Sequence, residues 1–340
     1  MLEAFPGAPL HTSLHNPTTT FPEFRDADIT TLALNRVHAL RTHHRLAFPL
    51  LAPAFSHHRV DAEVVVCSSS GWSHGLRTQG RKVVYCHSPA RWLYQAGRYL
   101  GSKPGAVGTA LSALRPWLVS WDRKAAQSAH RYVTNSSQVR RHVRTTYGID
   151  AEVLPPPPAL CPDGPRRQPA CIDPGFFLCV SRLLPYKNVD AIVAAFADLP
   201  AHRLVVVGEG PDRGRMESIR PGNVQFLGAV DDGELRWLYS ACEALVAASY
   251  EDYGLTTLEA AGFGKPSVVL RWGGFLDTVV GGETGLFFDE PSPDAIRAAV
   301  TRTHGDDWCP GSIQAHAAQF NPARFATRLQ EIVAQEAALS

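Results

Sequence analysis

Two carboxylates beside an expected helix start have the spacing of a site for a phosphorylated sugar. Glu251 and Glu259 lie eight positions apart in the segment Ser249–Pro266, where an apolar run ends and a helical pattern begins. Gly254 lets the backbone approach a ligand closely, and amides at a helix start favour an anion. Carboxylates accept hydrogen bonds from sugar hydroxyls, so the pattern predicts a diphosphate between two sugar-binding side chains. The amides expected to face the diphosphate are those of Leu255, Thr256 and Thr257.

A second loop carries two cations in the same kind of position. Arg182 and Lys187 lie in the segment Ser181–Asn188, between an apolar run and a helical pattern. A guanidinium and an ammonium group on one loop are suited to holding the oxygens of a diphosphate. Taken alone, each motif also has a simpler interpretation. The cations and Glu251 are then solvated surface charges, and Glu259 only complements the dipole of its helix.

A glycine-rich turn follows the next apolar run. Gly208 opens the segment Gly208–Pro211, whose small residues allow a ligand to come close to the backbone. A tight turn explains the same residues equally well. Gly208 is therefore a candidate ligand-binding residue for which both interpretations remain open.

These loops need parallel strands whose carboxyl ends meet at one edge of a sheet. In the second half of the chain, strands are predicted at residues 176–181, 203–208, 223–228, 243–249, 266–270 and 285–288. Helices are predicted at residues 188–198, 210–219, 231–241, 256–264, 275–280 and 294–303. This alternation indicates βαβ units and a parallel sheet with helices on both faces.

The first half of the chain shows the same alternation more weakly. Strands are predicted at residues 63–68, 82–87 and 131–135, and helices at residues 105–130 and 137–147, the first of them interrupted by Pro116. A last amphipathic helix is predicted at residues 322–338. The sequence therefore predicts an α/β protein with two doubly wound, Rossmann-like domains. Such domains, facing each other, place a ligand cleft at the carboxyl ends of their strands.

Four consecutive prolines mark the boundary between the two domains. The prolines of Val153–Ala159 cannot continue a helix or donate to a sheet, and they favour a stiff connector. The predicted division is a first domain at residues 1–154, a linker at 155–175 and a second domain at 176–318. The last part, residues 319–340, is expected to be a helix that packs back on the first domain.

Composition excludes several classes of protein. The chain has 340 residues, of which 45% are hydrophobic and 19% charged, as in ordinary globular domains, so disorder, collagen and coiled coil are excluded. The longest apolar stretch, Leu46–Phe55, is broken by Pro49 and Pro53, and no membrane span or signal peptide is predicted. The seven cysteines form no Cys-x-x-Cys pair that would indicate a zinc ribbon or a redox site. These features predict a soluble cytoplasmic protein.

Charge is divided unevenly along the chain. Residues 1–150 hold 18 Lys and Arg against 8 Asp and Glu, whereas residues 151–340 hold 15 against 24. The basic half is suited to an anionic membrane surface or a phosphorylated acceptor, and attraction between the two domains is the simpler explanation. No nucleic-acid motif accompanies the charge, so nucleic acid is not an expected partner. Peripheral contact with the inner face of a plasma membrane would use Arg36, Arg41, Arg45 and Arg59, and a solvated helix face explains these four arginines equally well.

Taken together, the motifs of the second half resemble the donor-binding domain of family 4 retaining glycosyltransferases, which have the GT-B fold. The resemblance includes Gly264–Pro266, Gly273–Gly274 and Glu283–Leu286. It implies that Arg182 and Lys187 hold the diphosphate of a nucleotide sugar, together with the backbone around Gly254, Leu255 and Thr256. It also implies that Glu251 binds the transferred sugar and Glu259 the ribose. Neither a metal ion nor another cofactor is implied.

The segment Tyr85–Tyr94 resembles bacterial mannosyltransferases that build surface polysaccharide, and it makes His87 a candidate catalytic residue beside Glu251, Arg182 and Lys187. The expected reaction is transfer of mannose from GDP-mannose, or of a hexose from a UDP-sugar, to a lipid-linked or oligosaccharide acceptor. The alternatives are a non-catalytic nucleotide-sugar-binding scaffold, an epimerase and a glycogen-synthase-like elongating enzyme.

The start of the chain departs from the family pattern. That pattern opens with a strand, a glycine-rich loop and a long helix, whereas Leu2–Leu10 resembles the end of that helix leading into the second strand. The sequence thus predicts an incomplete first domain, which a misplaced start codon, a truncated pseudoenzyme or a substituting segment would each explain.

Overall fold

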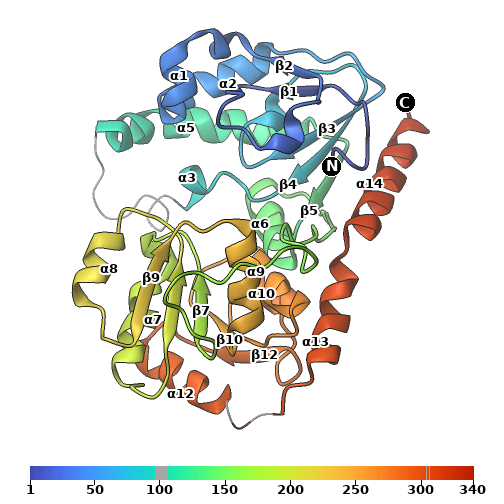
Figure 1. The fold of residues 1–340 in the computed structure, drawn as a ribbon. Coiled ribbons are helices and arrows are strands. Elements are labelled where there is room, and N and C mark those ends of the chain that lie inside the picture. The colour runs from blue at the N-terminus through green and yellow to red at the C-terminus, as the bar shows by residue number, and fades with distance from the viewer. Residues whose placement is uncertain (96–105, 304, 306) are drawn as a thin grey trace. The chain divides into compact units, whose positions relative to one another are not determined.

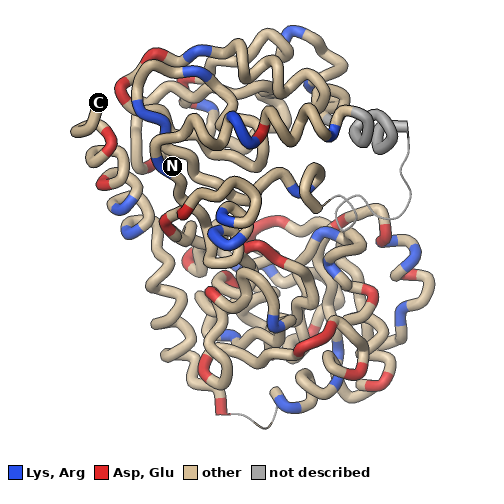
Figure 2. The backbone as a smooth tube through the Cα atoms, turned by 180° about the vertical axis from the view of Figure 1, so that it is seen from behind, with Lys and Arg blue, Asp and Glu red and all other residues tan. Residues whose placement is uncertain are grey.

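The computed structural model describes residues 1–95, 106–303, 305 and 307–340, and the chain forms two compact units (Figure 1). Unit 1 contains residues 1–135, 139–154 and 323–340, and unit 2 contains residues 136–138 and 155–322. The basic first half of the sequence therefore forms most of unit 1, and Figure 2 shows where the charged residues lie along the backbone. None of the helices in the described part of the chain combines the length and the apolar composition that crossing a bilayer requires.

Unit 2 is built around a sheet of six parallel strands. In chain order the strands are β7 (Phe177–Val180), β8 (Leu204–Val207), β9 (Val224–Gly228), β10 (Ala244–Ala247), β11 (Ser267–Leu270) and β12 (Gly285–Phe288). Their order in the sheet is β12-β11-β10-β7-β8-β9. The chain thus builds outward from β7 in one direction and then from β10 in the other. In an open α/β sheet, ligands bind where this reversal separates the carboxyl ends of two neighbouring strands.

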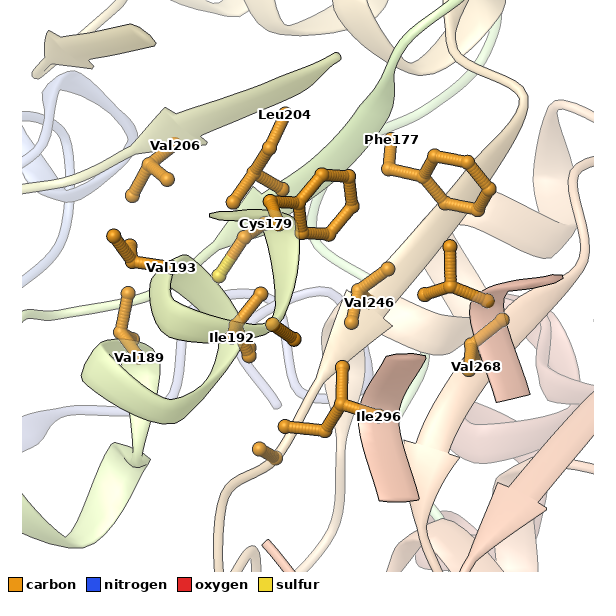
Figure 3. Close-up of a cluster of buried hydrophobic side chains, with 14 of the residues drawn as sticks. Phe177, Cys179, Val189, Ile192, Val193, Leu204, Val206, Val246, Val268 and Ile296 are labelled. Atoms are coloured by element: carbon orange, nitrogen blue, oxygen red, sulfur yellow. The ribbon is translucent and has the colours of Figure 1, made fainter. Parts of the chain in front are cut away.

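Helices cover both faces of this sheet, because successive strand side chains point to opposite faces and both sets are apolar. Phe177, Val206 and Val246 pack on one face with Ile192 and Ile296, which come from α7 (Val189–Ala197) and α12 (Pro293–Thr303) (Figure 3). The neighbours of these strand residues in sequence, Leu178, Val205 and Leu245, pack on the other face. Helices α9 (Asp232–Ala241) and α10 (Leu255–Gly262) contribute to that second cluster. The remaining helices of unit 2 are α8 (Arg213–Ile219), α11 (Phe275–Thr278) and α13 (Pro310–Ala317).

Unit 1 contains a second parallel sheet with its strands in sequence order. The strands are β3 (Val64–Ser69), β4 (Arg81–Cys86), β5 (Arg131–Thr134) and β6 (Glu152–Val153). A separate parallel pair is formed by β1 (Leu10–Thr12) and β2 (Ile29–Thr31). Residues 2–7 before β1 form turns, in which the Phe5 amide donates to the Met1 carbonyl at 3.2 Å. The resemblance of this segment to the end of a longer helix stays a prediction.

The described helices of unit 1 are α1 (His38–Thr42), α2 (Phe48–His57), α3 (Arg91–Tyr94), α5 (Ala106–Gln127), α6 (Ser137–Tyr147) and α14 (Pro322–Ala337). Two of them contain an internal proline. The apolar stretch that Pro49 and Pro53 were expected to break is helix α2, in which Pro49 occupies the first turn, where its missing N–H costs nothing. Helix α5 likewise continues through Pro116. Residue 105, at which that helix was predicted to begin, lies outside the described residues.

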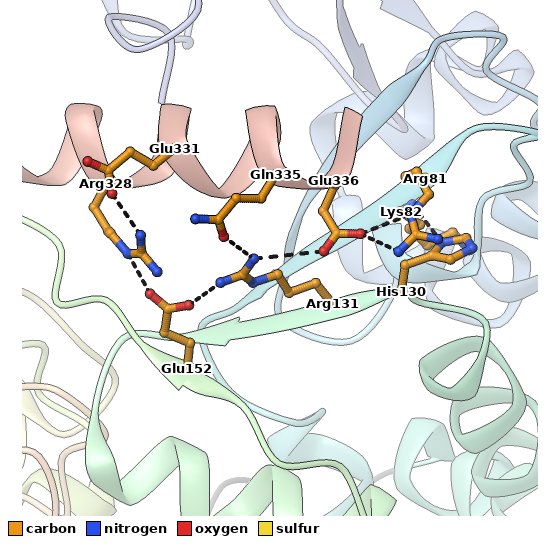
Figure 4. Close-up of polar contacts among 9 residues, drawn as sticks. All are labelled: Arg81, Lys82, His130, Arg131, Glu152, Arg328, Glu331, Gln335 and Glu336. Carbon is orange, nitrogen blue, oxygen red and sulfur yellow. Dashed lines mark hydrogen bonds and ion pairs between the residues drawn. The ribbon is translucent and has the colours of Figure 1, made fainter. Parts of the chain in front are cut away.

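The C-terminal helix α14 is part of unit 1, although it follows unit 2 in the chain. Its residues Phe325, Leu329 and Ile332 pack against a cluster that includes Tyr85 of β4 and Val133 of β5. A row of ion pairs lies beside this apolar contact (Figure 4). Arg81 contacts Glu336 at 2.7 Å, and Arg131 and Arg328 contact Glu152 at 2.6 and 2.7 Å. Glu336 and Arg328 belong to α14, so charge as well as apolar packing fixes this helix to the sheet.

Candidate active site

The candidate site of unit 2 lies in the loops that follow β7, β10 and β11. The β7 loop carries Arg182 and Lys187, and the β10 loop carries Glu251 and Gly254. Because β7 and β10 are the neighbouring strands at which the sheet order reverses, their carboxyl ends open the position where α/β sheets bind ligands. The sequence motifs therefore lie where the topology requires them.

Lys187 and Glu251 are in direct contact. The Lys187 ammonium forms an ion pair with Oε2 of Glu251, and the two side chains are only 13% and 21% exposed. The Ser249 hydroxyl donates to the same carboxylate oxygen at 3.4 Å. This pair joins the β7 loop to the β10 loop and places opposite charges side by side. A bound diphosphate would take over the ammonium and leave the carboxylate for a hydroxyl donor.

Tyr186 is a member of this group that the sequence analysis did not select. Its buried side chain has the Lys187 ammonium 5.2 Å from the ring centroid, and its hydroxyl is 3.4 Å from Nη2 of Arg182. The ring is therefore close to both cations of the loop. Arg182 itself is exposed, so its guanidinium is free to rearrange around an anion. A tyrosine between two cations was visible in the sequence, but nothing there showed that its ring would be buried.

Asn188 ties the two loops together and begins α7. Its backbone has φ 51° and ψ 32°, in the left-handed region that asparagine tolerates better than most residues. Its side-chain amide donates to the carbonyl of Ala248 at 2.8 Å. The loop that carries Lys187 is thereby fixed to the segment that leads to Glu251.

Gly208 and Gly210 are required by the contact between two loops. Gly208 has φ 126°, and a Cβ there would lie 2.1 Å from the carbonyl oxygen of Ser181. A Cβ at Gly210 would lie 2.2 Å from the carbonyl oxygen of Leu183. The two loops also share a hydrogen bond of 2.9 Å from the Leu183 amide to the Glu209 carbonyl. At Gly208, the backbone that comes close is thus that of the Arg182 loop.

Gly254 begins α10 with φ 90°, and a Cβ there would lie 2.8 Å from the ring of Phe275. The amides of Leu255 and Thr256 come next, at positions where a helix offers no internal acceptor. They are therefore suited to an anion, and their role in binding one stays a prediction. The prediction that Thr257 offers a third amide is wrong, because its N–H donates to the Gly254 carbonyl at 3.3 Å.

The loop after β11 supports the backbone of Glu251. The amide of Gly274 donates to the Glu251 carbonyl at 2.9 Å. A Cβ at Gly273 would lie 2.2 Å from that same carbonyl oxygen, and one at Gly274 would lie 2.2 Å from Cα of Tyr253. Two glycines are needed here because the two backbones touch.

Glu259 has other partners. It lies in the second turn of α10, not in the first as expected, since the helix begins at Leu255. Its Oε2 accepts a hydrogen bond of 2.8 Å from the hydroxyl of Tyr239, which is fully buried on α9. Burial raises the pKa of Glu259, and hydrogen bonds from Tyr239 and the Leu160 backbone oppose that rise. Glu259 is thus a half-buried hydrogen-bond acceptor whose partners, Tyr239 and the Leu160 backbone, are not those of Glu251.

His87 belongs to unit 1, directly after β4. Its Nε2 lies 2.8 Å from the hydroxyl of Ser68, and its ring packs edge-on against Tyr85 with 5.1 Å between centroids. Its carbonyl accepts a hydrogen bond of 3.2 Å from Asn135. Burial lowers the pKa of His87, so the imidazole is neutral at neutral pH. A neutral ring fixed by Ser68 can exchange one hydrogen bond with a ligand.

Models of two protein families match this chain. The model described as "Glycosyltransferase Family 4" matches residues 9–157, and the model described as "Glycosyl transferases group 1" matches residues 166–312. The first match covers most of unit 1 and the second covers most of unit 2.

Curated relatives include several glycogen synthases. That of Mycobacterium tuberculosis (strain CDC 1551 / Oshkosh) is 29% identical over 248 residues, which are 66% of this chain and 56% of the relative. That of Thermus thermophilus is 33% identical over 145 residues, 40% of this chain and 33% of the relative. The chain thus spans about half the length, or less, of these two relatives.

Solved structures show the same fold across both units. Sucrose-phosphate synthase from Thermosynechococcus elongatus superposes with a TM-score of 0.71 and 20% identity, covering 98% of this chain and 90% of the other. The lipopolysaccharide outer core galactosyltransferase WaaB, in its apo form, gives a TM-score of 0.61 and 15% identity over 94% and 88% of the two chains. These likenesses confirm the expected α/β fold with two Rossmann-like domains of the GT-B type.

Proposed function

We propose that this chain, a glycosyltransferase of the family 4 type by its two domains, transfers a hexose from a nucleotide-diphosphate sugar to an acceptor hydroxyl. The observation that carries the proposal is the contact between Lys187 and Glu251 at the reversal point of the strand order. The contact holds a cation that can bind a phosphate, Lys187, next to a carboxylate that can accept from a sugar hydroxyl, Glu251. The first amides of α10 follow Glu251 closely in the chain.

The chemistry requires that negative charge on the departing diphosphate be stabilised as the glycosidic bond breaks. Arg182, Lys187 and the amides of Leu255 and Thr256 supply positive charge and N–H donors for this purpose. When the diphosphate engages Lys187, Glu251 loses its ion-pair partner and accepts hydroxyls of the transferred sugar. The family resemblance implies that the anomeric configuration is retained, with the acceptor proton passing to a departing phosphate oxygen.

Two further residues have proposed roles. Glu259, already an acceptor for Tyr239, binds the ribose hydroxyls of the donor nucleotide. His87, neutral at neutral pH, hydrogen-bonds the donor sugar or a phosphate. Both roles come from the family resemblance. They are supported by the acceptor capacity that remains on the Glu259 carboxylate and by the ring nitrogen of His87 that Ser68 does not contact.

The proposed donor is GDP-mannose and the proposed acceptor a lipid-linked or oligosaccharide glycan of the cell surface. The support is the resemblance of Tyr85–Tyr94 to bacterial mannosyltransferases. A UDP-sugar is the alternative donor. Peripheral contact of the basic unit 1 with an anionic membrane belongs to the same proposal.

A second candidate function is elongation of a glucan, which the glycogen synthases among the relatives favour. One experiment compares the candidates. The purified chain is incubated with GDP-mannose, UDP-glucose or ADP-glucose, with and without glycogen or a polyprenyl-linked acceptor, and release of nucleoside diphosphate is followed. Release from GDP-mannose that needs the lipid acceptor supports the first proposal, and release from a glucose donor that needs glycogen supports the second. Donor binding without any turnover would contradict both and support a non-catalytic scaffold.

A further inference from the structure

A pocket lies in unit 1, away from the end of the sheet that carries His87. Its lining includes Lys82 at the amino end of β4 and His130 just before β5, whereas His87 follows the carboxyl end of β4. The cavity has a volume of about 640 Å³, within the range of small-molecule sites. All the residues that line it belong to unit 1, and none of them is part of the proposed donor site.

The pocket is strongly basic. Four cationic side chains line it, those of Arg59, Arg77, Lys82 and Lys124, and no Asp or Glu is among the described lining residues. Arg59 pairs with Asp61 at 2.9 Å, but both side chains are more than half exposed, so this pair is weak. Arg77 and Lys124 are exposed and have no ion-pair partner within the described part of the chain. The cavity therefore has an excess of positive charge.

Part of this positive charge, that of Lys82, is buried and held in place by hydrogen bonds. Lys82 is 4% exposed, and its ammonium donates to the carbonyls of His74 and Leu76 and to the Ser128 hydroxyl, at 3.0, 2.7 and 2.8 Å. The Ser128 hydroxyl gives its own proton to the Ala125 carbonyl, so it can only accept from Lys82. Three acceptors use three N–H bonds, which only the protonated amine has. A buried positive charge is thus held by neutral oxygens alone.

A histidine of the pocket adds a further donor. Nδ1 of His130 accepts the backbone N–H of Lys82 at 2.9 Å, so the proton of the neutral ring is on Nε2. The other histidine, His57, uses the N–H of its Nδ1 within α2, 2.7 Å from the Pro53 carbonyl. The pocket offers guanidinium, ammonium and imidazole N–H groups, and the ligand chemistry that matches them is an anion with several oxygens.

We propose that this basic pocket binds a small phosphorylated ligand, such as a diphosphate or a phosphate ester. The cavity is larger than a single phosphate requires, so it accommodates a second phosphate or the sugar or glycerol part of an ester. The same chemistry occurs in free metabolites and in the headgroups of anionic lipids. Binding supplies the counter-charge that Lys82 and its neighbours lack.

The test is calorimetric titration of the full chain with inorganic pyrophosphate. An Arg182→Gln/Lys187→Gln chain is used as the starting protein, so that the proposed donor site does not contribute to the signal. Adding Arg77→Gln and Lys124→Gln is expected to weaken binding about tenfold or more, since each removes a charge-assisted hydrogen bond. Both side chains are exposed, so the variants are expected to unfold at the same temperature as the starting protein. Lys82 is left unchanged, because its removal would disturb the buried network.

The matched control is Arg144→Gln, which removes an exposed cation of α6 that does not line the pocket. It is expected to leave pyrophosphate affinity unchanged. An equal loss of affinity in the control and in the pocket variant, or no pyrophosphate binding by the starting protein, would overturn the proposal. Neither result bears on the donor site, which is disabled throughout.

Two further arms identify the source of the phosphate. Glycerol phosphate and hexose phosphate represent free esters, and phosphatidylcholine vesicles with and without phosphatidylglycerol represent lipid headgroups. Ester binding that is lost in the pocket variant assigns a soluble ligand. Sedimentation with phosphatidylglycerol vesicles that is lost in the pocket variant, but not in Arg144→Gln, assigns a headgroup. Binding in neither arm overturns the proposal even if pyrophosphate binds.

Discussion

At the scale of single residues, the pairing of Lys187 with Glu251 has a consequence for mutations. The two charges pair with each other in a mostly buried position, so a change at one residue alters the surroundings of the other. Removal of a charged partner from a buried pair leaves an uncompensated charge. Effects on binding and on catalysis must therefore be measured separately for these two residues.

Glu251→Ala is expected to lower turnover by about two orders of magnitude, comparable to removal of a preorganised polar contact to a transition state. The physical reason is twofold, because the variant loses an acceptor for the sugar and frees Lys187 to bind the diphosphate in unproductive positions. The turnover is measured as the release of nucleoside diphosphate from the donor. Glu217→Gln, which changes a partly exposed glutamate of α8 paired with Arg213, is the control. Transfer by Glu251→Ala at the wild-type rate would contradict the assignment.

Glu259→Gln is expected to act differently. If its carboxylate binds the ribose, loss of its charge weakens nucleotide binding by about tenfold or more, and kcat changes little. The amide oxygen still accepts from Tyr239, so the fold is retained. Titration with the nucleoside diphosphate gives the affinity, and kcat comes from the transfer assay. A fall in kcat at unchanged nucleotide affinity would assign Glu259 to the reaction instead.

At the scale of elements, the carboxyl-end loops of unit 2 are supported by backbone contacts that only glycine allows. Gly273→Ala is expected to reduce kcat/KM at least about tenfold, because φ is 61° and the new Cβ would meet the Glu251 carbonyl. Gly214→Ala is the matched control, since nothing lies within 4 Å of a Cβ there. Its position in α8 even favours alanine. Both variants are assayed for transfer and for thermal unfolding, and equal activities would show that the β11 loop does not position Glu251.

The elements of unit 2 could be predicted from the sequence because each strand is a short apolar run bounded by polar residues. The expected run at 176–181 contains β7, and that at 203–208 contains β8. Strands β1, β2 and β6 escaped prediction, since two or three residues give no periodic pattern. Helix α2 was hidden by its prolines. The periodicity of the sequence identifies a helix or strand only when it is several residues long, and prolines obscure it in α2. The short strands and helix α2 are instead stabilised by packing against other elements, which the sequence does not show.

The candidate site could be predicted only in part. The spacing of Arg182, Lys187 and Glu251 placed them on loops that the fold brings together. Nothing in the sequence showed that Tyr186 would be buried between the cations or that the Thr257 amide would turn back to Gly254. Such details depend on how the loops pack, and packing is a property of the whole unit.

At the scale of the whole molecule, helix α14 links the end of the chain to unit 1 through paired charges. Burial raises the pKa of Glu152, but hydrogen bonds from Arg328 and Arg131 outweigh it, and the pKa is lowered overall. A carboxylate with a lowered pKa stabilises the fold above the pKa of a free glutamate, about 4.3, and this contribution is lost as the pH falls through the folded value.

Arg328→Ala is therefore expected to reduce the free energy of unfolding at neutral pH and to matter less in acid, where Glu152 is protonated. Urea unfolding of wild type and variant at both pH values measures the difference. Arg297→Ala is the control, because its partner Asp294 is 86% exposed and a pair of this kind contributes little. A loss of stability that does not depend on pH would mean that Arg328 acts through packing alone.

The route of the chain through α14 also sets an order of events during synthesis. Residues 323–337 are translated only after all of unit 2, yet they cover the apolar side chains of β4 and β5. When unit 1 leaves the ribosome, the apolar side chains of β4 and β5 that α14 later covers are therefore exposed to solvent. They stay exposed until unit 2 and then α14 have been translated. Chaperone binding or sticking to other nascent chains during this interval is the expected hazard, and a fragment that stops before α14 would carry the hazard permanently.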